Sequence, residues 1–193
     1  MWNLIRLPFA ALFATLIVFF WGVISWIKFD WHNTTIHRFE NEAAMEVAIR
    51  ENVSEPGMYW LPRMTDDEAG DSTANEAYQI RKNAGPFFFG FVRPGELASG
   101  NSAERNQILH LTFLFLSAVV MGVILWIARI RTYLGRVGFV TLMALFSAMV
   151  THIPYWTWFE FSVGHTIASM GDTLIGWTLG GFALATLIWP SDD

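Results

Sequence analysis

The 193-residue chain contains no cysteine, and this absence excludes several kinds of chemistry at once. Disulfide bonds, thiolate metal sites and cysteine nucleophiles all require that residue. The sequence also lacks the Gly-x-Ser-x-Gly, His-Glu-x-x-His and phosphate-loop motifs of common enzyme classes. An enzyme is therefore the least supported class of protein for this chain.

Charged residues are scarce as well, at 15% of the chain against 53% hydrophobic residues. The net charge is −5, and the acidic residues gather in residues 29–106. Because a nucleic-acid-binding protein needs a basic surface, this balance argues against nucleic acid as a partner.

Four long runs contain no Asp, Glu, Lys or Arg at all: residues 7–27, 108–128, 137–153 and 173–189. The hydrocarbon core of a bilayer is about 30 Å thick and needs about 20 helical residues. The first two runs reach that length, whereas the last two have 17 residues each and need flanking turns. A soluble helix of this length usually shows a polar face, so we expect four transmembrane helices rather than three.

The first run could instead belong to a cleaved signal peptide, because Arg6 precedes it. Its 21 residues exceed the usual apolar core of about 7–15, and residues 25–28 offer no small-x-small cleavage site. We therefore expect residues 1–28 to form an uncleaved membrane helix.

The positions of Lys and Arg predict the orientation of the chain in the membrane. The link 129–136 between the second and third runs carries three arginines, whereas the link 154–171 between the third and fourth carries no Lys or Arg. Positive residues stay on the cytoplasmic side, so both termini and 129–136 are expected inside. Residues 29–106 and the aromatic link 154–171 are then outside, and residues 107–193 contain the last three helices.

The outer segment 29–106 predicts a small α+β domain. A one-sided apolar stripe predicts a helix over residues 40–52. Short aromatic stretches at 58–61 and 87–92, bounded by Gly and Pro, predict an antiparallel pair of strands. Acidic residues 65–76 lack the spacing of a calcium-binding EF-hand loop, and we expect a solvated loop there. The predicted fold class is a mainly α membrane protein with an α+β extracytoplasmic insert.

Aromatic residues predict a protein interface, because a two-stranded unit with one helix is too small to be stable alone. The aromatic strands need a cover, which is either the aromatic link 154–171 or another protein. The expected interface residues are Trp60, Phe87, Phe88, Phe89, Trp156 and Trp158.

Small residues four positions apart predict close helix packing, since they let backbones approach in a bilayer. Gly176 and Gly180 form one such pair in the last run, and Gly181 and Ala185 form another. Counterparts in the other runs are Ala10 with Ala14, Ala118 with Gly122, and Ala144 with Ala148. These faces serve the internal bundle, a partner helix, or both.

Ionisable residues gather at one expected depth of the outer leaflet, where such groups are costly and often functional. His110 and His152 could be axial ligands of a haem between helices. His165, Glu160 and Asp172 could hold a divalent metal, or carry protons or a polar solute. Alternatively, these residues are satisfied by water at the interface, and Asp172 caps the start of the fourth helix.

Three stretches together resemble a group of bacterial inner-membrane proteins that has no established activity. They are residues 56–62, residues 85–89, and the region from 155–159 through Asp172 to Gly176 and Trp177. The resemblance covers most of the chain. It implies the bacterial cytoplasmic membrane as the location, and it assigns no role to any residue.

These observations favour a non-enzymatic accessory or structural subunit of a larger membrane complex, which requires only membrane helices, small-residue faces and an aromatic outer domain. The expected partners are the lipid bilayer and other membrane subunits or copies of the chain. A haem- or metal-binding redox protein is the first alternative, although the sequence requires no cofactor. A small oligomeric transporter is a further alternative, but four helices without a repeat fall short of the usual transporter pattern.

Overall fold

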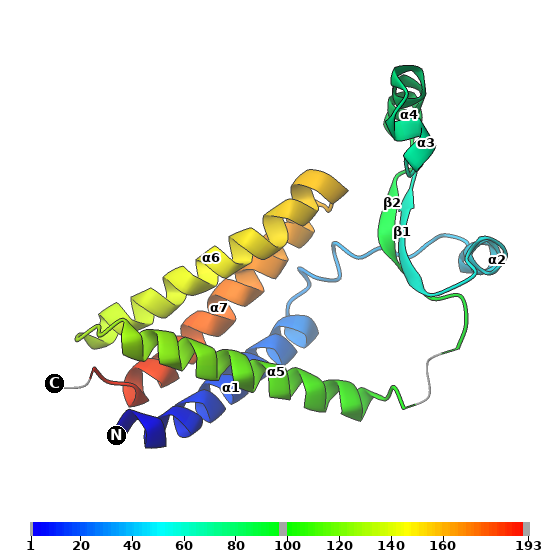
Figure 1. The fold of residues 1–193 in the computed structure, drawn as a ribbon. Helices are drawn as coiled ribbons and strands as arrows, with labels where there is room; N and C mark the ends of the chain where they lie inside the picture. Colours follow the sequence, from blue (N-terminus) through cyan, green and yellow to red (C-terminus); the bar gives the residue numbers. More distant parts are fainter. Residues whose placement is uncertain (1, 97–99, 191–193) are drawn as a thin grey trace. The chain divides into compact units, whose positions relative to one another are not determined.

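The computed structural model describes residues 2–96 and 100–190. The protein is mainly helical and divides into two compact units (Figure 1). The first, which we call the helical unit, comprises Met1–His37 and Gly100–Asp193. The second, which we call the insert, comprises Arg38–Ser99. Each unit is described by itself.

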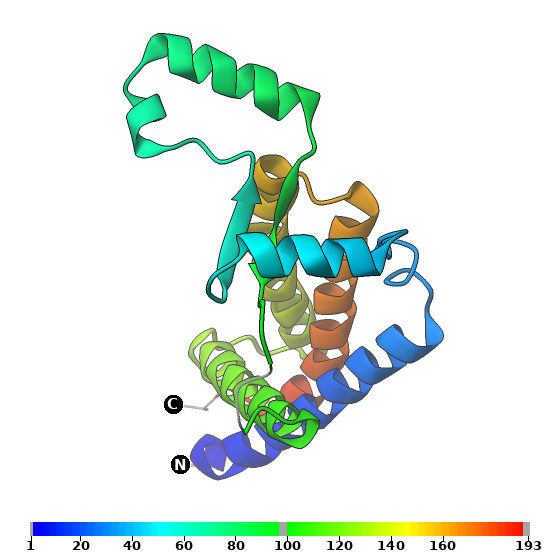
Figure 2. The ribbon, with the colours of Figure 1, turned by 90° about the vertical axis from the view of Figure 1, so that its right-hand side faces the viewer.

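The helical unit contains four long helices: α1 (Trp2–Lys28), α5 (Ala103–Ile127), α6 (Tyr133–Phe159) and α7 (Val163–Leu187). Helix α7 packs against both α1 and α6, and α5 packs mainly against α1. Figure 2 shows α6 and α7 running side by side. Helix α7 is therefore the central element of this unit.

In the described part of the chain, three helices are long and apolar enough to cross a membrane: Ile5–Lys28, Ala103–Ile127 and Tyr133–Phe159. They indicate a multi-pass membrane protein. The fourth expected span, α7, is not among these three helices and is not confirmed as a span; it contains Asp172 together with several glycine and threonine residues. Two neighbouring helices cover much of its surface, so α7 has less need of large apolar side chains.

The starts of the helices are set by polar caps rather than by the ends of the apolar runs. Ser102, Thr132 and Ser162 each accept a hydrogen bond from a backbone N–H in the first turn of α5, α6 and α7. Helix α7 therefore begins at Val163, nine positions before Asp172. The expectation that Asp172 caps this helix is wrong, because Ser162 does so.

The aromatic stretch 154–171 is mostly helical and is not an extended link. Helix α6 continues through Pro154 to Phe159, and Glu160 ends it in the left-handed conformation with φ 58°. Helix α7 resumes at Val163, so only three residues connect the two helices. Trp156 and Trp158 are exposed side chains on the last turns of α6.

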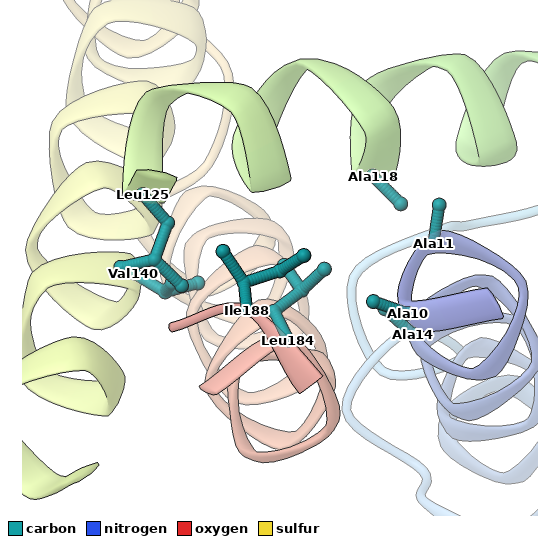
Figure 3. Packing of buried hydrophobic residues seen from close by; sticks show 8 residues of the cluster. All are labelled: Ala10, Ala11, Ala14, Ala118, Leu125, Val140, Leu184 and Ile188. Atoms are coloured by element: carbon teal, nitrogen blue, oxygen red, sulfur yellow. The ribbon is translucent and has the colours of Figure 1, made fainter. Parts of the chain in front are cut away.

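Small residues make the core of the helical unit. Ala11 of α1 points toward Ala118 of α5, and Leu184 of α7 lies in the same cluster together with Ile188, which follows the last residue of α7 (Figure 3). Every residue of the predicted small pairs is buried, so these faces pack within the bundle. The members are Ala10, Ala14, Ala118, Gly122, Ala144, Ala148, Gly176, Gly180, Gly181 and Ala185.

The adjacent glycines Gly180 and Gly181 let α7 approach two helices at once. A Cβ atom on Gly180 would lie 2.9 Å from a methyl carbon of Val18 and 3.5 Å from the carbonyl oxygen of Ala14, both on α1. A Cβ atom on Gly181 would lie 3.1 Å from Val140 on α6. One small residue thus faces each neighbouring helix.

The insert contains α2 (Glu42–Asn52), β1 (Gly57–Leu61), α3 (Asp66–Ala69), α4 (Ser72–Ala84) and β2 (Phe88–Val92). The strands pair antiparallel, with Trp60 opposite Phe89 and Met58 opposite Phe91. The predicted helix and both predicted strands are confirmed. The prediction of a solvated acidic loop at residues 65–76 is wrong, because two helices occupy this region.

The acidic residues of this region build helix starts. Thr65 and Glu68 form a reciprocal capping box at the start of α3, and the side chain of Asp71 accepts the backbone N–H of Thr73 in α4. Glu68 also accepts a hydrogen bond of 2.7 Å from Arg81 of α4. The Asp and Glu side chains therefore order the backbone of this exposed region as helix starts.

These contacts predict a pH dependence of the insert. The backbone N–H of Thr65, and then Arg81, hold the pKa of the Glu68 carboxyl below its usual 4.5. A lowered pKa in the folded state stabilises the protein above pH 4.5, and this contribution disappears as pH falls through the lower folded-state pKa. Wild type should therefore resist proteolysis within residues 65–84 better than Glu68→Gln at pH 7. The difference should shrink as pH falls below 4.5 and vanish once the Glu68 carboxyl is protonated in the folded state. Glu76→Gln, at an exposed position of α4, serves as control. An equal deficit there would contradict the assignment.

Candidate functional site

Asp172, in the interior of α7, is the centre of a hydrogen-bonded cluster. Its Oδ1 accepts a hydrogen bond of 2.5 Å from Ser25 Oγ, and its Oδ2 lies 2.7 Å from His32 Nε2. Trp31 Nε1 donates to Ser25 Oγ at 2.9 Å. We call these four residues the Asp172 cluster. It joins the end of α1, the following turn and α7.

A tight turn after α1 brings His32 back against Ser25. The backbone N–H of Thr34 donates to Asp30, and the N–H and hydroxyl of Thr35 both donate to the carbonyl oxygen of His32. The Trp31 ring packs beside Gly171 of α7, where an added Cβ atom would lie 3.8 Å from the ring. Residues 29–37 therefore belong to the helical unit, although the sequence placed them in the outer domain.

The His32 ring is almost completely enclosed. The residue is 2% exposed, and the ring of Trp26 stacks on it with centroids 4.1 Å apart and planes 1° from parallel. Among the described residues, His32 Nδ1 has no hydrogen-bond partner. An imidazolium would bury a second N–H there without an acceptor, at a cost in free energy. A proton on Nε2 lets the ring donate to Asp172, whereas Nδ1 has no acceptor for a second N–H among the described residues.

The cluster is not a Ser–His–Asp catalytic triad, although it contains the three residue types. In a triad the serine and the acid bind opposite nitrogens of the imidazole. Here Ser25 and Asp172 both approach Nε2, at 3.3 and 2.7 Å. Proton relay from Ser25 through the ring to Asp172 is not possible with this geometry.

Beside the cluster lies a cleft of about 600 Å³ between α1, α5 and α7, which we call the Asp172 cleft. Its polar lining comes from Gln107, His110, Asp172 and Thr173. The remaining lining is aromatic or aliphatic: Val18, Phe19, Trp21, Gly22, Val23, Trp26, Ile27, Leu114 and Trp177. The cleft thus combines one carboxylate with three tryptophans.

The two histidines considered as haem ligands have different surroundings. His110 lines the Asp172 cleft, with its ring 6.1 Å from that of Phe19. His152 lies on α6, where its Nε2 is 3.5 Å from Thr173 Oγ1, and it does not line the cleft. Among the described residues that line this cleft, no two imidazoles face one another.

The residues considered for a metal are not assembled either. Within residues 2–96 and 100–190, no group of three or more His, Asp or Glu side chains could hold a metal ion. Asp172 contacts His32, whereas His165 contacts the ring of Phe161 and Glu160 is exposed. His165 and Asp172 lie on one continuous helix, about 10 Å apart along its axis at 1.5 Å per residue.

The predicted interface residues fall into two groups. In the insert, the Trp60 ring lies edge-on to Phe87 and Phe89, with centroids 6.4 and 5.9 Å apart, and Phe88 is exposed. In the helical unit, Gly176 and Gly180 are buried against α1, where a Cβ on Gly176 would lie 3.0 Å from Trp21.

Sequence reasoning missed Ser25 and His32. The available signal was the single carboxylate of Asp172 in an otherwise apolar helix, since such a group requires a polar partner. The chain matches no protein-family model, no curated protein and no solved structure.

Proposed function

We propose that the protein is a non-enzymatic accessory subunit of a larger membrane complex, and that the sheet of the insert binds another subunit. The observation that carries this proposal is the exposure of large apolar side chains on both faces of a two-stranded sheet. Contiguous apolar surface of this kind marks protein interaction sites.

The pairing register defines the two faces, because side chains alternate along each strand. Met58, Trp60, Phe89 and Phe91 share one face, and Met58 and Phe91 are 57% and 66% exposed. Leu61 and Phe88 pair on the other face and are 53% and 39% exposed. A partner strand or helix can bury side chains on either face.

The insert buries little of its own apolar surface. Tyr78 of α4 is the one buried hydrophobic residue among its described residues. An isolated two-stranded sheet is marginally stable in water, and it gains stability when further strands or a helix cover it. Association with another subunit would supply that cover.

The proposal includes a placement in the bacterial cytoplasmic membrane. Helix α7 serves as the fourth span, since its 25 residues are long enough and α1 and α6 shield it from lipid. The arginines of the link 129–136 favour cytoplasmic termini and an extracytoplasmic insert.

The test is gentle purification from the native membrane, with size and composition measured by native mass spectrometry. Wild type should carry stoichiometric companion subunits, and Phe91→Asp should lose them because it places a charge on the apolar sheet. Ile80→Asp is the matched control, since Ile80 is an exposed residue of α4 in the same unit. A monodisperse homomer of the wild type, or equal companion loss in both variants, would refute the proposal.

A further inference from the structure

We propose that the Asp172 cleft binds a lipid-soluble organic cation of the quaternary ammonium or phosphonium type. Asp172 is the counter-ion, and Trp21, Trp26 and Trp177 supply the aromatic walls. The proposal concerns the helical unit alone and does not depend on the partner surface of the insert.

Charge is the first argument. The described lining of the cleft contains the carboxylate of Asp172 and no Lys or Arg. The two partners of Asp172 are the hydroxyl of Ser25 and Nε2 of His32, whose Nδ1 has no acceptor for a second N–H among the described residues. With a single proton on the ring, these partners satisfy the oxygen atoms and leave the negative charge for another cation. A charge held among membrane helices is costly without a counter-ion, and the cleft admits one.

The aromatic lining is the second argument. A ring face attracts a cation through its quadrupole, and tryptophan does so most strongly. Aromatic groups combined with a carboxylate recognise quaternary ammonium ions, which have no N–H groups to donate. Trp21 and Trp26 come from α1, and Trp177 lies five positions beyond Asp172 on α7, so the rings border the cleft from two helices.

The volume and the lining of the cleft indicate what the rest of the ligand is like. A volume of about 600 Å³ lies within the range of sites for drug-sized molecules. Val18, Phe19 and Leu114 provide an apolar lining for its hydrocarbon groups. Gln107 and His110 provide a polar lining near the start of α5.

A free cation fits better than the headgroup of a zwitterionic phospholipid. Such a headgroup brings a phosphate together with its ammonium group, and phosphate is recognised by Arg or Lys. The lining residues include neither. The occupant is therefore a single positive charge with apolar substituents.

The binding test uses the full-length protein in a nonionic detergent and isothermal titration calorimetry, with protein-free micelles subtracted. Tetraphenylphosphonium is the probe, and tetraphenylborate has the same shape with the opposite charge. We expect saturable binding of one phosphonium per chain and no saturable binding of the borate. Absence of saturable phosphonium binding, or equal binding of the borate, would overturn the proposal.

Gly22→Leu tests the position of the site without removing a polar contact. A Cβ atom on Gly22 meets nothing within 4 Å, so the leucine fills the cleft without a clash at its first atom. Affinity for the phosphonium should fall at least about tenfold, or about 1.4 kcal/mol. Gly138→Leu is the matched control, since Gly138 also has open space and lies on α6 outside this cleft. Wild-type affinity in Gly22→Leu would place the binding elsewhere and reject the assignment.

Asp172→Asn tests the charge. The asparagine keeps an oxygen that can accept the hydrogen bond from Ser25 but loses the negative charge, so the affinity should also fall at least about tenfold. An unchanged affinity would remove Asp172 as the counter-ion. Lysophosphatidylcholine is then added as competitor to wild type. We expect no competition; displacement of the phosphonium would show that a phospholipid headgroup occupies the cleft and would refute the free cation.

Discussion

Gly180→Leu is expected to destabilise the helical unit by about 3 kcal/mol, the upper part of the range for overpacked cores. The new Cβ atom would lie 2.9 Å from Val18 and 3.5 Å from the carbonyl oxygen of Ala14. Val18 is a short, β-branched side chain that cannot swing away as the end of a long side chain does, so α1 and α7 must separate. The measurement is the loss of helical circular dichroism during titration with a denaturing detergent.

The matched control for this change is Gly138→Leu. Both glycines lie in the interior of a long helix, but a Cβ atom on Gly138 meets nothing within 4 Å. Its effect should stay within about 0.5 kcal/mol, as for surface substitutions that touch no special feature. Equal destabilisation by the two leucines would show that the close contact of α1 with α7 contributes nothing.

The buried faces of the helices could be predicted because small residues are the means by which apolar helices approach closely. Gly176, Gly180 and their counterparts are all buried as that rule requires. The sequence did not decide between internal packing and a partner helix. That choice depends on which helices lie side by side, and the neighbours of α7 come from the first and third apolar runs.

The ends of the helices could not be predicted from apolar runs alone. Ser162 starts α7 well before the fourth run, because its side chain satisfies the N–H of His165. Asp172 therefore lies in the interior of α7 and not at its N-terminal cap. The prediction of a loop at residues 65–76 failed for the same reason. It was based on acidic composition, whereas Thr65 and Asp71 are the N-caps of two helices.

The partner of Asp172, His32, could not be predicted from the sequence. His32 lies 140 positions away and follows the first helix within a polar segment. A search for the partner of an acid in an apolar helix leads to the histidines, but it cannot choose among five of them. The turn of residues 29–35 folds back on Ser25 and thereby places His32, rather than another histidine, beside Asp172.

A second site of large expected effect is Arg136, which is 5% exposed near the start of α6. Its Nε donates to the carbonyl oxygen of Ala185 at 3.1 Å, and its Nη1 donates to the carbonyl oxygens of Arg131 at 2.8 Å and Ile130 at 3.3 Å. Its guanidinium group also lies 5.7 Å from the ring centre of Trp189.

Arg136 thus donates to three backbone carbonyl oxygens, and its contact with that of Ala185 is buried. The last four carbonyl groups of a helix have no partner within it, and Ala185 is one of those residues in α7. The negative end of the α7 dipole also favours a cation at this position. The arginine therefore fastens the end of α7 to the start of α6 and to the link before it.

Arg136→Met, which keeps the length of the side chain but removes its donors, should cost about 3 kcal/mol, because hydrogen bonds to charged groups contribute about 1.5–3 kcal/mol each. Arg136→Lys should give an intermediate loss, since one ammonium group cannot reach carbonyl groups spread as widely as a guanidinium can. Arg131→Met is the control: it removes the same charge from an exposed side chain in the same link, so any effect of charge on membrane orientation is matched.

Because the chain has no cysteine, Ala185→Cys provides a local readout of the same contact. Ala185 is fully buried, so a thiol reagent should label the introduced cysteine slowly in the otherwise wild-type protein. Labelling should accelerate strongly when Arg136→Met is added, since the end of α7 is then free to separate from α6, and it should stay slow with Arg131→Met. If both backgrounds label at the same rate, the hydrogen bonds of Arg136 do not hold α7 in place, and the buried arginine must be explained by its packing against Trp189 alone.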